Sequence, residues 1–231
     1  MDFANRRVLG LRLPILIYIT FFVVVGVLVL VGQFVIGSGK SGAVLLEDDF
    51  SEPSAAWPAG ATEGGFTSFS SGEYRVGVDP DGSITAVRDL DAEGSDVRVA
   101  VDVVRRPQAG TVLFGVACRV RSGNRFDEFV ISTSGRWAIV HSPDHGVIGQ
   151  GSFGASVLGT GPIRLEATCA RDPSGGATRL ALSVNGTVVG RGRDARGEAI
   201  DESPGGVGMV VENGSGDPAD VRFDDFRVTV P

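Results

Sequence analysis

Lysine and histidine are scarce in this sequence of 231 residues. Lys40 is the only lysine among 21 basic residues, a bias that indicates a GC-rich bacterial genome and says little about function. The two histidines, His141 and His145, lie in a loop with Asp144 and have no further clear ligand close in sequence. Because zinc sites collect three or four ligands at regular spacing, we interpret this loop as surface and not as a metal centre.

Charge is absent between Arg12 and Lys40. Residues 13–36 read L-P-I-L-I-Y-I-T-F-F-V-V-V-G-V-L-V-L-V-G-Q-F-V-I. As a helix these roughly 24 residues would rise about 36 Å, enough to cross a hydrocarbon core of about 30 Å. A cleaved signal peptide has a shorter apolar region and a small-residue cleavage site, which F-V-I-G at residues 34–37 does not provide. The stretch therefore predicts a retained transmembrane helix.

Basic residues are unevenly placed around this helix. Arg6, Arg7 and Arg12 precede it, whereas Lys40 alone follows closely. The positive-inside rule then puts residues 1–12 in the cytoplasm and residues 13–36 in the bacterial cytoplasmic (inner) membrane. Residues 37–42 form a short linker. Residues 43–231 form one domain on the periplasmic or extracellular side.

Positive charge is also in short supply within that domain. The first 40 residues carry a net charge of +3, so the total of −7 leaves −10 for the rest of the chain. A domain this acidic argues against binding to nucleic acid. The G-K-S triplet at residues 39–41 does not form a phosphate-binding loop, because Phe34 stands where that motif requires glycine.

A convincing apolar period of 3.6 residues is missing beyond the linker. Apolar and polar residues alternate instead in about a dozen short segments, separated by turn residues. The predicted strands span residues 43–50, 73–79, 83–88, 97–103, 111–121, 126–132, 136–141, 162–170, 178–184, 187–191, 207–211 and 221–230. This pattern predicts an all-β antiparallel sandwich.

Cysteine occurs only twice, and both residues belong to the domain. Cys118 and Cys169 each lie on the apolar face of a predicted strand. If these strands are neighbours or face each other across the core, the thiols form a buried disulfide, which the oxidising compartment permits. Closing a loop of about 50 residues would stabilise the domain by about 3–4 kcal/mol. The alternative is two reduced cysteines that pack as small hydrophobic residues.

Three motifs give the domain a family resemblance. They are L-L-E-D-D-F-S at residues 45–51 with Trp57 shortly after, V-N-G at 184–186, and V-R-F-D-D-F-R-V at 221–228. Together they resemble the concanavalin A-like lectin/glucanase jelly rolls, in particular uncharacterised versions on bacterial membrane proteins. The resemblance covers nearly all of residues 43–231 and implies an antiparallel jelly-roll sandwich. Because that fold hosts lectins, glycosidases, adhesive modules and spacers, it leaves the function open.

A pair of closely spaced catalytic carboxylates on one strand is not evident. Glycosidases of this family carry E-x-D-x-x-E within one strand; residues 47–52, E-D-D-F-S-E, have this spacing but run past the end of the predicted strand 43–50. Asp102, Glu128 and Glu166 lie singly on three predicted strands, each with an arginine close in sequence. We interpret them as members of cross-strand ion pairs on a polar sheet face. No catalytic residue and no cofactor is assigned, and the chain is predicted not to be an enzyme.

Aromatic side chains outside the apolar stretch are few. Sugar-binding sites usually stack a glycan on exposed aromatic rings. Trp57 and Trp137 are the candidate glycan contacts. However, Trp137 shares the parity of Ile139, which favours the core, and Trp57 precedes Pro58, which favours a plug over one end of the sandwich.

Two acidic pairs lie on the first and last predicted strands, which pair in many jelly rolls. They are Asp48-Asp49 and Asp224-Asp225. The apolar parity slips around the second pair, which predicts a β-bulge there. Since a bulge can turn several oxygens toward one point, these four aspartates are candidate ligands of a structural calcium ion. The alternative is that they are edge acids that accept hydrogen bonds from neighbouring turns.

Three hypotheses on function follow. The leading one is a non-enzymatic, single-pass scaffold module, an accessory subunit that contacts other membrane-protein subunits. A linker of about six residues would hold the domain within roughly 15–20 Å of the bilayer, which suits such contacts. The second hypothesis is a carbohydrate-binding module near the cell wall. The third is a glycoside hydrolase that uses Asp102, Glu128 or Glu166.

Overall fold

The computed structural model describes residues 41–90, 96–107, 111–121, 125–195 and 205–231. Residues 42–231 form one compact unit. The strands within the described ranges are β1 (Val44–Asp48), β2 (Gly60–Thr62), β3 (Gly65–Ser70), β4 (Glu73–Val78), β5 (Ser83–Arg88), β6 (Val97–Arg105), β7 (Val112–Arg121), β8 (Arg125–Ser132), β9 (Arg136–Ser142), β10 (Gly146–Ser152), β11 (Ile163–Arg171), β12 (Thr178–Val184), β13 (Thr187–Asp194), β14 (Gly206–Asn213) and β15 (Ala219–Thr229). One short 3-10 helix, η1 (Ala155–Val157), precedes β11.

The predicted transmembrane helix, residues 13–36, lies outside the described residues, as do residues 1–12 and most of the linker. Among the residues that the structure describes, no helix combines the length and the apolar character needed to cross a membrane.

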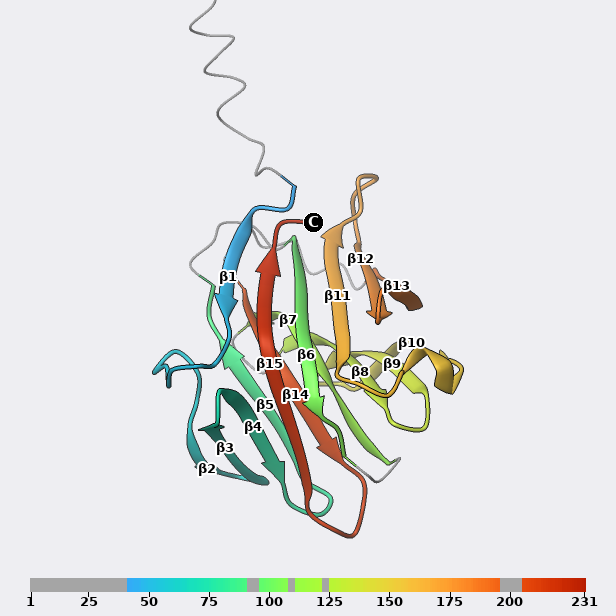
Figure 1. Cartoon of the computed structure of the whole chain (residues 1–231). Helices are drawn as coiled ribbons and strands as arrows, with labels where there is room; N and C mark the ends of the chain where they lie inside the picture. Colours follow the sequence, from blue (N-terminus) through green and yellow to red (C-terminus); the bar gives the residue numbers. More distant parts are fainter. Residues whose placement is uncertain (1–40, 91–95, 108–110, 122–124, 196–204) are drawn as a thin grey trace, which may run out of the picture. The chain divides into compact units, whose positions relative to one another are not determined.

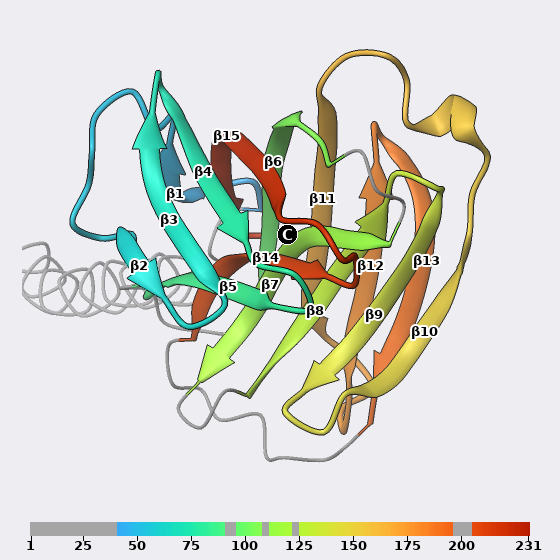
Figure 2. The ribbon, with the colours of Figure 1, turned by 90° about the horizontal axis from the view of Figure 1, so that it is seen from below.

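The strands form two antiparallel sheets. The nine-stranded sheet has the order β13-β12-β11-β6-β15-β4-β3-β2, with β1 paired to β15 as well, and the six-stranded sheet has the order β10-β9-β8-β7-β14-β5. Figure 1 shows β15, β6 and β11 of the first sheet in front of β14 and β7 of the second. Figure 2 shows the two sheets from below. The predicted all-β jelly-roll sandwich is therefore confirmed.

The core lies between the sheets because apolar residues occupy alternate positions along the strands. On β7 the side chains of Val112, Phe114 and Val116 are buried in the main core. Successive side chains of a strand point to opposite faces, so Leu113 and Ala117 lie on the outer face of the six-stranded sheet. This alternation is the signal from which the sequence predicted most of the strands.

A disulfide joins the two sheets across this core. Cys118 on β7 and Cys169 on β11 are bonded, with their Cα atoms 6.7 Å apart. Both residues are fully buried. The predicted bridge is confirmed, in the arrangement in which the two strands face each other across the core.

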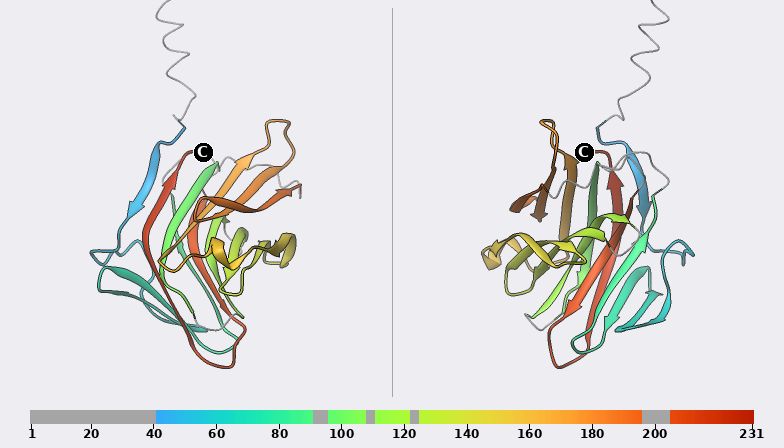
Figure 3. Two further views of the ribbon diagram at one scale, coloured as in Figure 1. Left: turned by 45° about the vertical axis from the view of Figure 1, so that its right-hand side comes forward. Right: turned by 180° about the vertical axis from the view of Figure 1, so that it is seen from behind.

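The first described strand pairs with the last one. In β1, Asp48 lies opposite Phe226 of β15, and both views of Figure 3 place these two strands side by side. The predicted β-bulge lies on the other edge of β15, where the register against β6 shifts between Asp224 and Arg227. Asp225 takes a φ of 47° there, so the extra residue is accommodated in the left-handed region.

Candidate functional site

A cavity of about 420 Å³ opens on the outer face of the six-stranded sheet, the face turned away from the core. We refer to it as the outer-face pocket. Five neighbouring strands, β5, β14, β7, β8 and β9, and the loop after β9 contribute to its wall. Its lining residues are Ser83, Thr85, Val87, Val120, Phe126, Glu128, Ser142, Pro143, His145, Val210 and Glu212.

The apolar side chains of Phe126 and Val210 line this pocket, and we refer to them as its floor. With Ala117 and Val130 they form a small buried cluster that is separate from the main core. Each takes an outward position on its strand, where a fully solvated sheet face would carry polar residues. The outer face therefore carries apolar side chains that are shielded from solvent. Phe126 is the aromatic residue in the pocket lining.

Two glutamates meet above this floor. Glu128 lies on β8 and Glu212 on β14, and their carboxyl groups are in hydrogen-bonding contact. Only 4% of Glu128 is exposed. Its Oε2 atom is buried without a hydrogen-bond partner. Because a buried polar atom normally has a hydrogen-bond partner, this oxygen is a position where a bound ligand could supply the missing donor.

The electrostatics of this pair favour one shared proton. Burial, followed by repulsion from the carboxylate of Glu212, raises the pKa of Glu128 to about 8. Two carboxylates in contact cannot both ionise cheaply, since like charges destabilise each other at close range. At neutral pH the Glu128 carboxyl therefore keeps its proton and can donate a hydrogen bond.

This geometry differs from that of a resting two-carboxylate glycosidase. Retaining enzymes hold the two carboxyl groups about 5–5.5 Å apart and inverting enzymes hold them about 6.5–9.5 Å apart. Groups in hydrogen-bonding contact, as Glu128 and Glu212 are, stand closer than either distance. The pair would have to open before a glycosidic bond could fit between the two side chains.

Asp127 is the centre of a second polar cluster, which ties together β7, β8, β9 and β13. Arg119 Nη1 lies 3.0 Å from Asp127 Oδ2 and 3.6 Å from Asp194 Oδ2. His141 Nδ1 lies 3.0 Å from Asp127 Oδ1 and 3.9 Å from Asp194 Oδ2. Burial raises the pKa of Asp127, although Arg119 and His141 both oppose the shift.

The ligand atoms of Asp127, His141 and Asp194 lie within 4.8 Å of one another, as a metal site would require. However, the guanidinium of Arg119 already lies among these carboxylates and supplies the positive charge. Cys118, Asp127 and Cys169 are equally close, but both sulfurs are used in the disulfide. We interpret the Asp127 cluster as an ion-pair network that joins the edge strand β13 to the six-stranded sheet.

The four predicted calcium ligands do not converge in the described part of the chain, where the close groups of three or more metal-ligating side chains involve other residues. Asp48 accepts hydrogen bonds from the Trp57 indole at 3.0 Å and from Arg88 at 2.9 Å. Asp49 accepts one from the backbone of Ser51. Asp224 Oδ1 accepts the backbone N–H of Asp225. The geometry thus favours the alternative, in which these acids bond to neighbouring groups.

Trp57 does not offer a platform to a glycan. It is 2% exposed and packs edge-on against Phe50 and Phe226. Its indole N–H is used by Asp48, and the neighbouring Tyr74 hydroxyl donates to the Pro58 carbonyl at 2.6 Å. The candidate glycan contact at Trp57 is therefore corrected, and the interpretation of this residue as a plug is supported.

Trp137 lies between the edges of the two sheets. A Cβ atom on Gly190 of β13 would stand 2.6 Å from its ring, and one on Gly151 of β10 would stand 2.8 Å from the indole nitrogen. The ring is packed against the main core and is partly buried. Backbone from two edge strands packs against this ring, so Trp137 serves in packing, and its candidate role as a glycan contact stays a prediction.

Two of the three single carboxylates form the expected ion pairs. Asp102 lies 3.1 Å from Arg164, which is its direct cross-strand neighbour, and Glu166 lies 3.6 Å from Arg98. Both pairs lie on the nine-stranded sheet. Glu128 lies on the other sheet and contacts Glu212, which the sequence analysis did not single out. The available signal was parity, because Glu212 shares the outward face of β14 with the apolar Val210.

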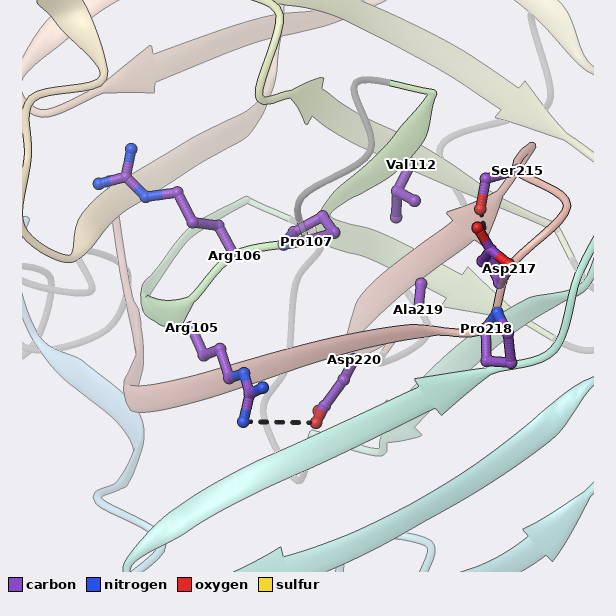
Figure 4. A pocket seen from close by; sticks show the side chains of 9 residues that line it. All are labelled: Arg105, Arg106, Pro107, Val112, Ser215, Asp217, Pro218, Ala219 and Asp220. Carbon is purple, nitrogen blue, oxygen red and sulfur yellow. Dashed lines mark hydrogen bonds and ion pairs between the residues drawn. The ribbon is translucent and has the colours of Figure 1, made fainter.

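A second cavity, of about 290 Å³, lies at the end of the sandwich between the strand ends of β6 and β15. Figure 4 shows Arg105 reaching Asp220 across it while Arg106 points away. Asp220 lies 3.8 Å from Arg105 and 3.1 Å from Arg75. Arg106 donates to the carbonyls of Gly159 and Gly161. Since these charged groups are partnered within the protein, this cavity is a weaker site than the outer-face pocket.

Comparison with solved structures identifies the fold. A GH43 protein, BlXynB of Bacillus licheniformis, matches with a TM-score of 0.58 and 21% identity over 80% of this chain and 39% of its own. A Bacillus subtilis protein titled as having a galectin-like fold and unknown function matches with a TM-score of 0.58 and 16% identity, over 83% of this chain and 97% of its own. A lichenase from a mouse hindgut metagenome matches with a TM-score of 0.52 and 13% identity, over 80% of this chain and 98% of its own. The domain has a galectin-like jelly-roll fold.

The chain thus spans about two fifths of the GH43 protein but nearly the whole of the other two. No protein-family model and no curated protein matches the sequence. The prediction that the chain is not an enzyme is overturned: solved glycoside hydrolases share its fold, and the carboxylates thought to be single include one that is paired in a pocket.

Proposed function

We propose that the domain binds a glycan in the outer-face pocket. The observation that carries this proposal is the buried Glu128 carboxyl, which stands beside Glu212 above an apolar floor that contains Phe126. Ligand sites combine apolar surface with polar groups that fix the orientation of the ligand. The lining of this pocket contains both, with six polar and five apolar side chains. The fold neighbours support this hypothesis better than the scaffold hypothesis, because one is titled a GH43 protein and another a β-1,3-1,4-glucanase.

The chemistry of the pocket suits a polyhydroxylated ligand. A sugar hydroxyl both donates and accepts, so it can take the proton of Glu128 and donate to Glu212. The lining hydroxyls of Ser83, Thr85 and Ser142 provide further partners. Carbon–hydrogen faces of the sugar ring would contact the apolar lining side chains, which are Val87, Val120, Phe126 and Val210.

The test is a glycan array probed with the full chain. Glu212→Ala removes the accepting carboxylate and is expected to weaken binding of any captured glycan by roughly tenfold or more, the cost of one hydrogen bond to a charged group. Glu63→Ala changes an exposed glutamate away from the pocket and serves as the matched control. Binding that Glu212→Ala leaves unchanged would contradict this location, and an array without any captured glycan would contradict the proposal itself.

Glycoside hydrolysis is a second candidate, favoured by one observation. Glu128 keeps its proton at neutral pH, which is the state that a general acid needs to protonate a leaving group. Ligand entry would have to separate it from Glu212. Release of reducing ends from a β-1,3-1,4-glucan, lost in Glu128→Gln, would support this activity; unchanged turnover in that variant would exclude Glu128 as the acid.

The placement of the domain belongs to the same proposal. The charge-free residues 13–36 and the arginines before them support a single membrane span with the domain outside the cytoplasm. A protease added to spheroplasts, which lack an outer barrier, is expected to remove the domain. Protection until the spheroplasts are lysed would contradict this topology.

A further inference from the structure

We infer that the outer-face pocket takes the ammonium group of an amino sugar and holds it between Glu128 and Glu212. This inference rests on the proposed glycan binding and names its ligand class. The shared chemistry is a primary ammonium carried on an otherwise neutral, polyhydroxylated ring. Three features of the pocket lead to it.

The first feature is the sign of the charge. Of the described residues that line the pocket, the ionisable ones are Glu128, Glu212 and His145. Two of the three are acids, and the lining contains neither arginine nor lysine. An anionic sugar, such as a uronic acid, would meet carboxylates that repel it. A cationic group would meet complementary charge.

The second feature is the orphaned oxygen. Oε2 of Glu128 is buried and has no partner, while the same carboxyl group contacts that of Glu212. An ammonium group carries three donors and no acceptor. It can bond to this oxygen and to Glu212 together, which a single hydroxyl hydrogen cannot do. The hydroxyls of Ser142 and Thr85 also line the pocket, and either can offer the third acceptor.

The third feature is the number of side chains that could coordinate a bound cation, which favours an ammonium group over a metal ion. Calcium takes six to eight oxygens and zinc takes four ligands. The close groups of three or more metal-ligating side chains in the described residues do not include Glu128 or Glu212. Two carboxylates over an apolar, aromatic floor instead match an ammonium on a carbon frame, and Phe126 adds a π face to its surroundings.

Binding also has a proton balance. In the absence of ligand the Glu128 carboxyl holds a proton at neutral pH, which the ammonium replaces. The proton leaves Glu128 for the solvent, and the two carboxylates then share the charge of the ligand. Glu212 and His145 are the other titratable groups that face this position, from β14 and from the loop after β9.

The test titrates the full chain calorimetrically near neutral pH with a glucosamine oligomer and with the matched N-acetylglucosamine oligomer, which lacks the charge. We expect the glucosamine oligomer to bind at least about tenfold more tightly, with release of a proton to the buffer. Glu128→Gln and, independently, Glu212→Gln should each bring the ratio of the two affinities close to one. The exposed Glu63→Gln should leave the ratio unchanged.

Equal affinities for the two oligomers would overturn this inference and leave glycan binding intact. Tighter binding of a polygalacturonate would overturn it as well. A lysine peptide that binds as tightly as the glucosamine oligomer would show a general ammonium site and reject the amino-sugar assignment. If the array and both oligomers give no binding at all, the inference and the proposed function fail together.

Discussion

Single side chains decide how the polar groups of this domain are used. Asp48 looks in the sequence like one half of an acidic pair, yet its oxygens serve the Trp57 indole, Arg88 and the backbone of Phe50. Glu128 looks like the partner of a nearby arginine, yet it contacts another glutamate. In both cases the partner is fixed by the three-dimensional position and not by the neighbouring sequence.

Replacing Glu128 by glutamine should change how stability depends on pH. The folded-state pKa, about 8, lies above the unfolded value, so folding takes up a proton between these two values. The wild type is therefore most stable, relative to the variant, below the unfolded pKa of about 4.5, and loses stability as pH rises to about 8. Glu128→Gln should remove this loss, which is on the order of a few kcal/mol.

The measurement is urea unfolding at several pH values between 5 and 9, roughly the window set by these two pKa values. Glu63→Gln serves as the control, because that side chain is exposed. Parallel stability curves for wild type and Glu128→Gln across this window would show that burial of Glu128 is not coupled to its proton.

Trp57→Phe tests the contribution of the hydrogen bond between the Trp57 indole and Asp48 to stability. The ring stays apolar and aromatic, but Asp48 Oδ2 loses the indole donor at 3.0 Å and keeps only Arg88. Asp48 is half-buried, so leaving part of its carboxylate without a donor should cost about 1 kcal/mol, the low end of the range for buried groups, and lower the urea midpoint. Asp49→Asn, at the exposed neighbouring position, should leave the midpoint where it is. An unchanged midpoint in Trp57→Phe would mean that the bond to Asp48 adds nothing.

At the scale of the element, the packing of two edge strands depends on glycines that make room for one large ring. β10 and β13 approach the ring of Trp137 through Gly149, Gly151 and Gly190, where a side chain would collide with the ring or come into close contact with it. The same glycines give β10 no alternation of apolar and polar residues, and this explains why the sequence analysis did not predict that strand. β2 and β3 were missed for a related reason, since they lie in a passage rich in glycine and proline.

Gly190→Ala tests this packing at the edge of the sandwich. The new Cβ would stand 2.6 Å from the Trp137 ring, so the ring or the strand must move. We expect a loss of about 1–3 kcal/mol in the free energy of unfolding and a shift in tryptophan emission. Gly161→Ala is the control, because nothing lies within 4 Å of the Cβ it would add. Equal stability of the two variants would show that the edge adapts without strain.

At the scale of the molecule, the local sequence pattern predicted more of the fold than of the candidate site. Alternating apolar residues and turn signals were enough to place twelve of the strands, the sandwich and the two cysteines facing the core, because these depend on short-range parity. The order of strands in each sheet depends on long-range pairing. For that reason the meeting of Glu128 with Glu212, on strands separated by β7, was not predicted.

Removal of the disulfide should weaken the whole domain. Cys118 and Cys169 are 51 residues apart in sequence and join the two sheets, so the bond restricts the unfolded chain. The double variant Cys118→Ala/Cys169→Ala should lose about 2–5 kcal/mol of unfolding free energy. Thermal unfolding of the wild type with and without a reductant gives the same comparison without a mutation. If neither treatment lowers stability, the bridge contributes only packing.

The position of β15 in the middle of the nine-stranded sheet has a consequence for biosynthesis. This strand lies between β6 and β4 and also pairs with β1, yet it is the last described strand to leave the ribosome. Until it emerges, the edges of β1, β4 and β6 that pair with β15 stay unpaired. Completing the sheet requires contacts between residues far apart along the polypeptide, which slows folding. Nascent chains of this domain therefore need shielding from one another until synthesis has passed residue 229.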